Sequence, residues 1–146
     1  MPTPPSLFHM HAPDAEMLVA AWLAPVRRSG VAFRTGDPLP FTLVTRIGGD
    51  ENFWIREDEP LVSVHTLCDV SLGYAAAAEE AQMTHDRMLE LAWTLGPVTM
   101  PDGSLVCVEY LKPFQYPVWR DYEDVTILRK VGRYKMGLPY LWNDVA

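Results

Sequence analysis

The glycine pair Gly48-Gly49, with the acidic residues after it, is the part of the sequence most suggestive of a chemical site. The strand-like stretch PFTLVTRI precedes it, and glycines after a strand are typical of phosphate-binding loops. Such a loop also needs the N-terminus of a helix, whose partial positive charge holds the anion. Here Asp50 and Glu51 follow directly, and the chain contains no Lys-Ser or Lys-Thr pair. The local charge has the wrong sign for phosphate, so the sequence argues against a nucleotide site.

The other groups able to do chemistry are histidines, carboxylates and cysteines. His65 falls within a predicted strand and His85 within a predicted helix, and neither lies in a GxSxG or HExxH motif. The carboxylates of residues 50–59 lie in a predicted solvated loop, where they keep ordinary pKa values. Cys68 and Cys107 have no CxxC spacing and are best explained as small buried hydrophobes. The sequence therefore predicts no enzyme, no cofactor and no metal site.

Length and composition predict one ordinary globular domain. The chain has 146 residues, 49% of them hydrophobic, and a formal net charge of −7. Nucleic acids are bound by clustered Lys and Arg, and the nearest approach to a cluster is Arg129, Lys130, Arg133 and Lys135. Stable nucleic-acid binding is therefore not expected. The longest apolar run, 17–26, contains a proline and is too short to span a membrane, so we expect no membrane partner, intracellular synthesis and reduced thiols.

Hydrophobic periodicity predicts an α+β fold with a mostly antiparallel sheet of four to five strands flanked by two helices, in the order α-β-β-β-α-β-β. Asp14 can cap the first helix, which Pro25 should end or bend. The predicted strands cover 31–34, 41–47, 61–68, a hairpin of 98–100 with 105–111, and 125–136, and the longest helix covers 73–95. Residues 48–59 and 112–124 are predicted to be loops.

Around this domain, assigned to residues 14–136, we expect an irregular N-terminal arm (1–13) and an apolar C-terminal tail (137–146). Three aromatic clusters fall outside the predicted core elements, and they comprise Phe53, Trp54 and Ile55, then Trp119, then Tyr140, Leu141 and Trp142. Each cluster could fold back on its own subunit. Aromatic residues in such places commonly mark interfaces, so the sequence favours a protein that assembles with others.

Several short motifs resemble those of tail terminator (tail completion) proteins of long, flexible-tailed bacteriophages. The first is the strand end Arg46-Ile47-Gly48-Gly49, which precedes a variable loop. A strand with Pro60, Leu61, Val62, Val64 and Asp69 follows, and then a helix that starts with the alanines 75–78. The resemblance covers roughly residues 14–95, and the aromatic segment 112–122 and the tail depart from it.

The resemblance implies an α+β subunit of a virion, assembled in the cytoplasm of a host bacterium. Such subunits form a ring, usually a hexamer, that caps the head-proximal end of the tail tube, stops tube polymerisation and meets the head–neck connector. The implied partners are other copies of the chain, the tail tube protein and the connector protein. DNA would pass through the lumen without stable binding, which the acidic balance of the chain favours.

In this interpretation the glycine pair is a flexible hinge from which a core strand releases a loop tipped with Phe53 and Trp54. The loop would then reach a neighbouring subunit or the tube. Two other interpretations stay open. The chain could be another head–tail connector or neck protein, or it could be a small intracellular binding module with a ligand pocket under the acidic loop.

Overall fold

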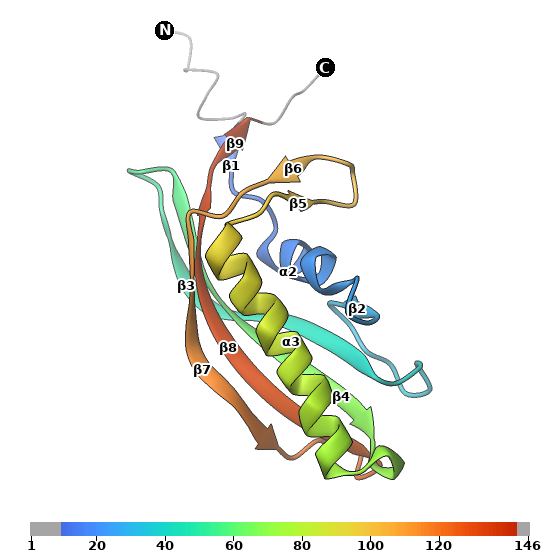
Figure 1. Ribbon diagram of the computed structural model, residues 1–146. Coiled ribbons are helices and arrows are strands. Elements are labelled where there is room, and N and C mark those ends of the chain that lie inside the picture. The colour runs from blue at the N-terminus through green and yellow to red at the C-terminus, as the bar shows by residue number, and fades with distance from the viewer. Residues whose placement is uncertain (1–9, 143–146) are drawn as a thin grey trace, which may run out of the picture.

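A five-stranded sheet with two helices on one of its faces forms the body of the protein (Figure 1). The computed structural model describes residues 10–142. The strand order is β2-β3-β4-β8-β7, with bounds Ser29–Gly30, Phe41–Asn52, Glu57–Asp69, Ile127–Pro139 and Tyr110–Arg120 respectively. The predicted α+β class and the two helices are confirmed. The sheet is mixed rather than purely antiparallel, because β2 runs parallel to β3.

Shorter elements complete the fold. The helices are α2 (Ala15–Leu23) and α3 (Tyr74–Thr94), and a 3-10 turn, η1 (Val70–Leu72), precedes α3. β5 (Val98–Thr99) pairs with β6 (Leu105–Val106), which confirms the predicted hairpin although its strands are short. Near the two ends of the described chain, β1 (Met10–His11) pairs with β9 (Leu141–Trp142). Residues 1–9 of the predicted arm and 143–146 of the predicted tail lie outside the described residues.

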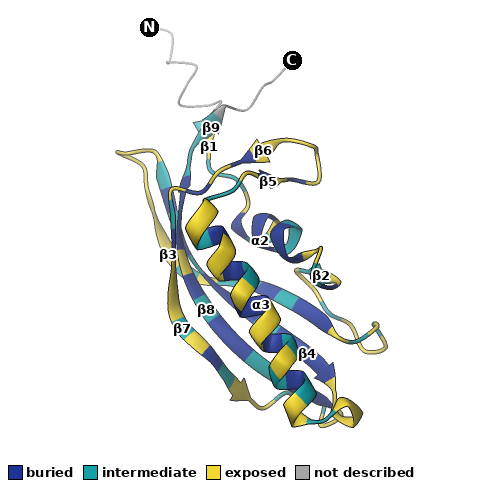
Figure 2. Ribbon diagram, in the orientation of Figure 1, coloured by how far each residue is buried: buried dark blue, intermediate teal, exposed yellow. Residues whose placement is uncertain are grey.

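Both helices bury their apolar stripes against the same face of the sheet. The side chain of Asp14 accepts a hydrogen bond from Met17 N at 3.0 Å and begins α2, as predicted. The small residues Ala77 and Ala81 let α3 approach the sheet closely, and Met88 fills the core further along the helix. Figure 2 shows the result, with a buried side of α3 toward the sheet and an exposed side toward solvent.

Strand β4 confirms the alternation that its sequence predicts. Val62 and Val64 are buried beneath the helices in the main core. The residues between them and beyond, such as His65 and Leu67, point to the opposite face of the sheet, which carries no helix (Figure 1). At one corner of that face Phe41 and Leu67 form a smaller cluster with Ile127. The sheet therefore has one helix-covered face and one face that is largely open.

The prediction of a loop over residues 48–59 is wrong. β3 and β4 pair as far as Asn52 and Glu57, with one irregularity between Arg46 and Gly48, so only residues 53–56 form the turn of a long hairpin. The hairpin was missed because Asp, Glu and Gly are depleted in strands. A hydrogen-bonded ion pair offsets this, since Arg46 Nη1 and Nη2 donate to the two carboxylate oxygens of Asp58, at 2.7 and 2.8 Å. Gly48 and Gly49 lie inside the strand, so the prediction of a flexible hinge is also wrong.

Two further predictions need correction. Residues 31–34 are not a strand, because the short strand there is Ser29–Gly30 and pairs with Thr42 and Leu43. Residues 112–120, predicted as loop, belong to the strand β7. Pro113 and Pro117 argued against a strand, but β7 is an edge strand, where a missing N–H can face away from the sheet. The last strand continues beyond the predicted residue 136 to Pro139.

Candidate functional site

The tip of the β3–β4 hairpin exposes a compact group of large apolar side chains. Phe53, Trp54 and Ile55 are exposed by 52%, 89% and 60%. The rings of Phe53 and Trp54 contact each other edge to face, with centroids 5.7 Å apart. Figure 1 shows the hairpin extending well past the helices, so the tip lies away from the helix-covered body of the subunit. Exposed aromatic side chains in such a position are typical of a docking site.

The hairpin that carries this tip is built from paired strands that approach closely at a bulge. The strand register shifts between Arg46 and Gly48, which makes a β-bulge, and Gly49 adopts φ +94°. A Cβ at Gly49 would collide with the Glu59 carbonyl oxygen and would lie 2.7 Å from Leu61 N. The close approach of the two strands therefore requires glycine at position 49. Of the two glycines predicted as site residues, Gly49 is the one that the strand geometry requires, since a Cβ at Gly48 would meet nothing within 4 Å.

The chain after β8 packs against this arm. Tyr140 N donates a hydrogen bond of 2.9 Å to the carbonyl of Arg56, and the Tyr140 hydroxyl donates to a carboxylate oxygen of Glu51. That hydrogen bond raises the pKa of Tyr140 to about 12. Leu141 pairs with His11 and packs against the main core, and the backbone of Trp142 pairs with Met10. Tyr140 and Leu141 thus contact their own subunit.

Trp119 lies apart from the other predicted site residues. It is opposite Lys130, far along β7 from the end that adjoins the hairpin. Its ring contacts Tyr74 edge to face at 5.1 Å and lies 5.1 Å from Lys130 Nζ, and it remains 38% exposed. The structure therefore brings the hairpin tip and Tyr140 together at one end of the sheet, and Trp119 belongs to a different surface.

That second surface, along α3 and β7, carries exposed aromatics that sequence reasoning did not assign to a site. Trp93 on α3 is 89% exposed, and Phe114 and Tyr116 on β7 are also exposed. Tyr116 donates a hydrogen bond to Gln82 Oε1 on α3. The assignment of 112–124 to a loop hid this surface, because no strand face was then expected there.

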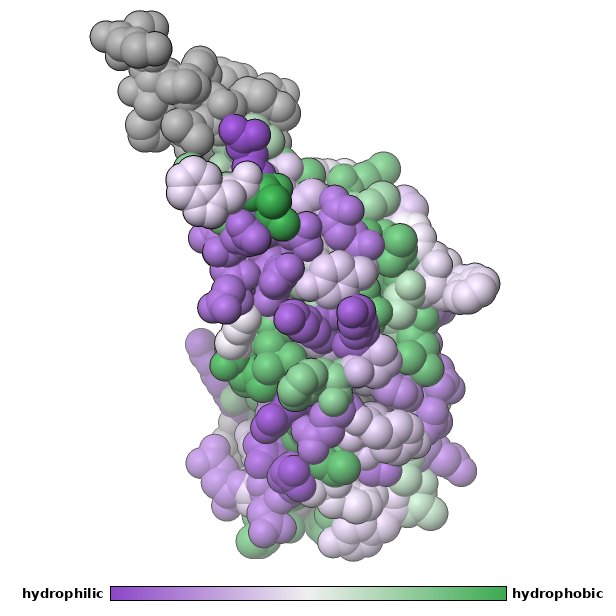
Figure 3. All heavy atoms as spheres, turned by 90° about the vertical axis from the view of Figure 1, so that its left-hand side faces the viewer, coloured by the Kyte–Doolittle hydropathy of each residue, from purple (hydrophilic) through white to green (hydrophobic). Residues whose placement is uncertain are grey.

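The open face of the sheet carries a second feature, a group of cations that we call the basic belt, of which the sequence showed only the part on the last strand. Its members occupy one face of β7 and β8 by register, and they are Lys112, Arg120, Arg129, Arg133 and Lys135. Within residues 10–142 none of them forms an ion pair. The side of the molecule with β7 and the hairpin has a mixed surface, in which hydrophilic residues alternate with hydrophobic patches (Figure 3). The period-2 spacing of Arg129, Arg133 and Lys135 was the available signal.

A pocket of about 360 Å³ opens in the middle of this face. Leu43 and Ile47 contribute apolar walls, and Arg129 and Arg133 line its other side with His65. Three buried nitrogens, Arg129 Nε, Arg133 Nε and His65 Nδ1, have no hydrogen-bond partner among the described residues. Buried N–H groups are nearly always paired in a complete assembly, so the guanidinium groups have capacity for an acceptor from outside the chain.

His65 makes the stability of the subunit depend on pH. Burial, followed by the charges of Arg129 and Arg133, lowers the pKa of His65 from 6.5 to about 4. Between these values the unfolded chain binds a proton that the folded chain does not. We expect the free energy of unfolding to fall by about 2 kcal/mol as the pH drops through this window, allowing for partial exposure.

His65→Gln should remove that part of the pH dependence, while retaining a group that can hydrogen-bond to the Ser63 hydroxyl, now 2.8 Å from His65 Nε2. Urea unfolding at pH 7, 5.5 and 4.5 gives the free energy of unfolding of the wild type and the variant. The titration of carboxylates affects both proteins equally, so it cancels when the two are compared. Equal pH dependence in the two proteins would contradict the assignment.

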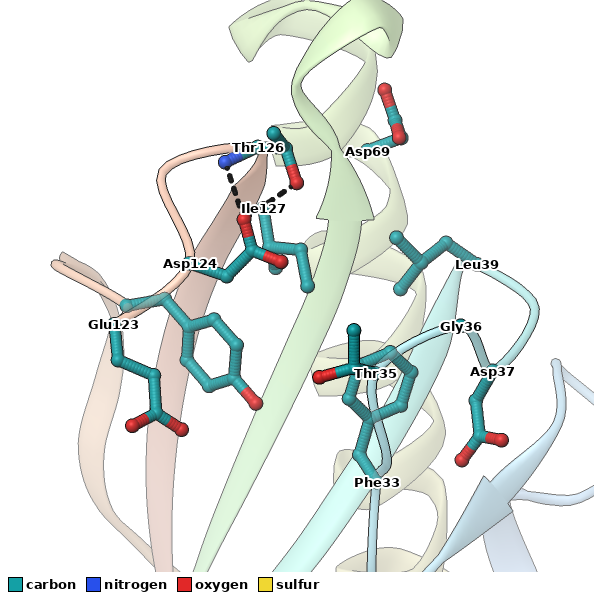
Figure 4. A pocket seen from close by; sticks show the side chains of 11 residues that line it. Phe33, Thr35, Gly36, Asp37, Leu39, Asp69, Glu123, Asp124, Thr126 and Ile127 are labelled. Atoms are coloured by element: carbon teal, nitrogen blue, oxygen red, sulfur yellow. Dashed lines mark hydrogen bonds between the residues drawn. The ribbon is translucent and has the colours of Figure 1, made fainter.

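An acidic pocket of about 530 Å³ lies at the far end of the sheet from the hairpin. Asp69 caps η1 through Ser71 N at 2.8 Å, and Asp124 accepts from Thr126 N and Oγ1 at 2.9 and 2.6 Å. The side chains of Asp37 and Glu123 stand apart from these and from each other (Figure 4). Within the described part of the chain, no three His, Cys, Asp or Glu residues are placed to hold a metal ion. Asp37 likewise accepts a hydrogen bond from Arg34 N at 2.8 Å, so all three aspartates of the pocket serve to fix local turns.

A pocket of about 520 Å³ beside the hairpin is the place where the ligand-binding interpretation expected a site. Its lining includes Asp14, Glu16, Glu51 and Asp58, and its one guanidinium, that of Arg46, is already bound by Asp58. His11 also lines the pocket, and the carboxylates of the pocket hydrogen-bond within the chain, such as Glu16, which accepts from Arg46 N at 2.9 Å. The contacts in this pocket serve to fix the base of the hairpin.

Comparison with known proteins bears on the fold. No protein-family model matches the sequence, and no curated protein matches it either. Among solved structures, the chain is similar to a chain of the "Virion of native gene transfer agent (GTA) particle", with a TM-score of 0.50 and 16% sequence identity. The similarity covers 85% of this chain and 86% of that one. The two chains share a fold.

Across residues 10–142, no helix combines the length and apolar character needed to cross a membrane.

Proposed function

We propose that the chain is a structural protein of a virion, and more specifically a tail terminator that forms a ring on the head-proximal end of the tail tube. The observation that carries the proposal is the fold shared over most of its length with a chain from a gene transfer agent virion. The order of the motifs around Arg46 to Gly49 and Pro60 to Asp69 supports the choice of a terminator within that class.

The surface of the subunit supports an assembling role. A closed ring needs two different, complementary patches on each subunit, and its size follows from the rotation between them. The hairpin tip is one such patch, with Trp54 almost fully exposed on an arm held by the Arg46–Asp58 pair. The aromatic surface along α3 and β7 offers a separate contact for the tube protein or the connector.

The proposed ring is a hexamer with DNA passing through its lumen. A net charge of −7 keeps the genome from adhering to the ring as it passes. The proposed partners are thus other copies of this chain, the tail tube protein and the head–neck connector.

Electron microscopy of particles labelled with a gold-conjugated antibody tests the proposed location. We expect label at the junction of head and tail, and rings in negatively stained preparations of the purified protein. Label along the whole tail would instead identify a tube protein. A protein that stays monomeric and is missing from particles would overturn the proposal.

A further inference from the structure

We infer that the basic belt on the open sheet face is the docking surface for the β3–β4 hairpin of a second copy of this chain. This inference rests on the proposed ring and names its subunit contact. The hairpin continues the plane of its own sheet as two paired strands, so its tip cannot turn back onto the belt of the same subunit. The contact must therefore join different copies.

Like charges face each other on both surfaces. On the hairpin, Asp50 lies directly opposite Glu59 in the strand register. In the belt, Lys112 lies opposite Lys135, and Arg120 lies opposite Arg129. Directly opposed like charges destabilise a sheet, and none of these six residues has an ion-pair partner within residues 10–142. If the hairpin of one copy docks on the belt of another, the carboxylates of the hairpin lie near the cations of the belt, and the repulsion within each pair is offset.

The apolar parts of the two surfaces also match. The pocket within the belt has walls of Leu43 and Ile47, and Ile47 is 44% exposed. The hairpin presents Phe53, Trp54 and Ile55 beside its carboxylates. An interface with a desolvated aromatic anchor and a rim of charge pairs is the usual arrangement of a protein–protein contact.

This composition favours a protein partner over a nucleic acid. A long polyanion needs a continuous basic track. The belt is bounded on one side by the hairpin carboxylates Asp50 and Glu59, and on the other by the acidic pocket with Asp69 and Asp124. A nucleic acid crossing this face would meet negative charge at both ends. A short acidic arm would not.

The contact is heterologous, because the hairpin and the belt are different patches of one subunit. Copies joined in this way form a head-to-tail series that closes into a ring when the rotation allows it. Each subunit would then give one hairpin and receive one.

A charge-swap experiment on the full chain tests the inference. The belt variant carries Lys112→Glu with Lys135→Glu, and the hairpin variant carries Asp50→Lys with Glu59→Lys. Reversing both members of an opposed pair keeps the repulsion within the subunit, so each variant should melt close to the wild type. Each variant alone should need an at least 100-fold higher concentration to form rings in sedimentation velocity. An equimolar mixture should recover assembly to within tenfold, because alternating variants restore opposite charges at every contact.

The matched control is Arg34→Glu, which reverses an exposed cation outside the belt and should assemble as the wild type does. If the wild type forms rings and both charge variants do so equally well, the inference is wrong while the proposed function stands. Failure of the mixture to recover assembly would also overturn it. If the wild type stays monomeric at every concentration, there is no ring, and both proposals are wrong.

The last outcome concerns DNA. If the wild type binds a DNA duplex at 150 mM salt and the belt variant does not, the belt binds nucleic acid rather than a second copy of the chain, and the inference is wrong.

Discussion

Gly49→Ala should destabilise the subunit by about 3–5 kcal/mol, through the backbone alone. Position 49 has φ +94°, a conformation that disfavours any side chain, and an added methyl would collide with the Glu59 carbonyl of the facing strand. The bulge would have to open, which would separate the hairpin arm from the register that Arg46 and Asp58 hold. Urea unfolding followed by circular dichroism measures the loss.

The neighbouring glycine provides a matched control. A Cβ at Gly48 meets nothing within 4 Å, and its φ is not positive. Gly48→Ala should therefore change the free energy of unfolding by less than about 1 kcal/mol. Equal effects of the two substitutions would contradict the assignment of the bulge to Gly49.

The second large effect is expected on assembly. The double substitution Phe53→Ala with Trp54→Ala should raise the concentration needed for ring formation by at least about 100-fold, because aromatic anchors carry a large share of the energy of an interface. The melting temperature should stay within a few degrees of the wild type, since both side chains are mostly exposed in the subunit. Sedimentation velocity and thermal melting of the same samples separate the two effects.

Trp93→Ala is the control for this experiment. Trp93 is as exposed as Trp54, at 89%, but lies on α3 away from the hairpin. Ring formation should survive its loss. If Trp93→Ala abolishes rings and the hairpin variant does not, the subunit contact lies on the α3–β7 surface and the role given to the hairpin is wrong.

The parts of the fold that the sequence predicted are those with a regular period. β4 alternates between buried and open faces, and α3 has a helical stripe with glycine before it, so local patterns alone located both. β7 was missed because Pro113 and Pro117 break the pattern of a strand, and only its position at the edge of the sheet explains their tolerance. The hairpin beyond Gly48 was missed because acidic residues rarely form strands without a partner such as Arg46.

In the candidate site, too, features that depend on neighbouring residues in the sequence could be predicted, and features that depend on strand order could not. The sequence left open whether Phe53, Trp54 and Ile55 fold back on their own subunit; the structure exposes all three, while their role as an interface stays a prediction. The basic belt could not be predicted as a unit. Lys112 and Lys135 are far apart in sequence and become neighbours only when β7 pairs with β8. Charge that gathers across strands is invisible until the strand order is known.

The length of tails made without this protein tests the central claim most directly. A terminator stops tube polymerisation, so deletion of its gene should give overlong tail tubes without heads, and a copy supplied in trans should restore normal length. The Phe53→Ala, Trp54→Ala variant should fail to restore length, whereas the Trp93→Ala variant should succeed. Tails of normal length in the deletion would contradict the account, and normal-length tails without heads would identify the chain as a neck protein instead.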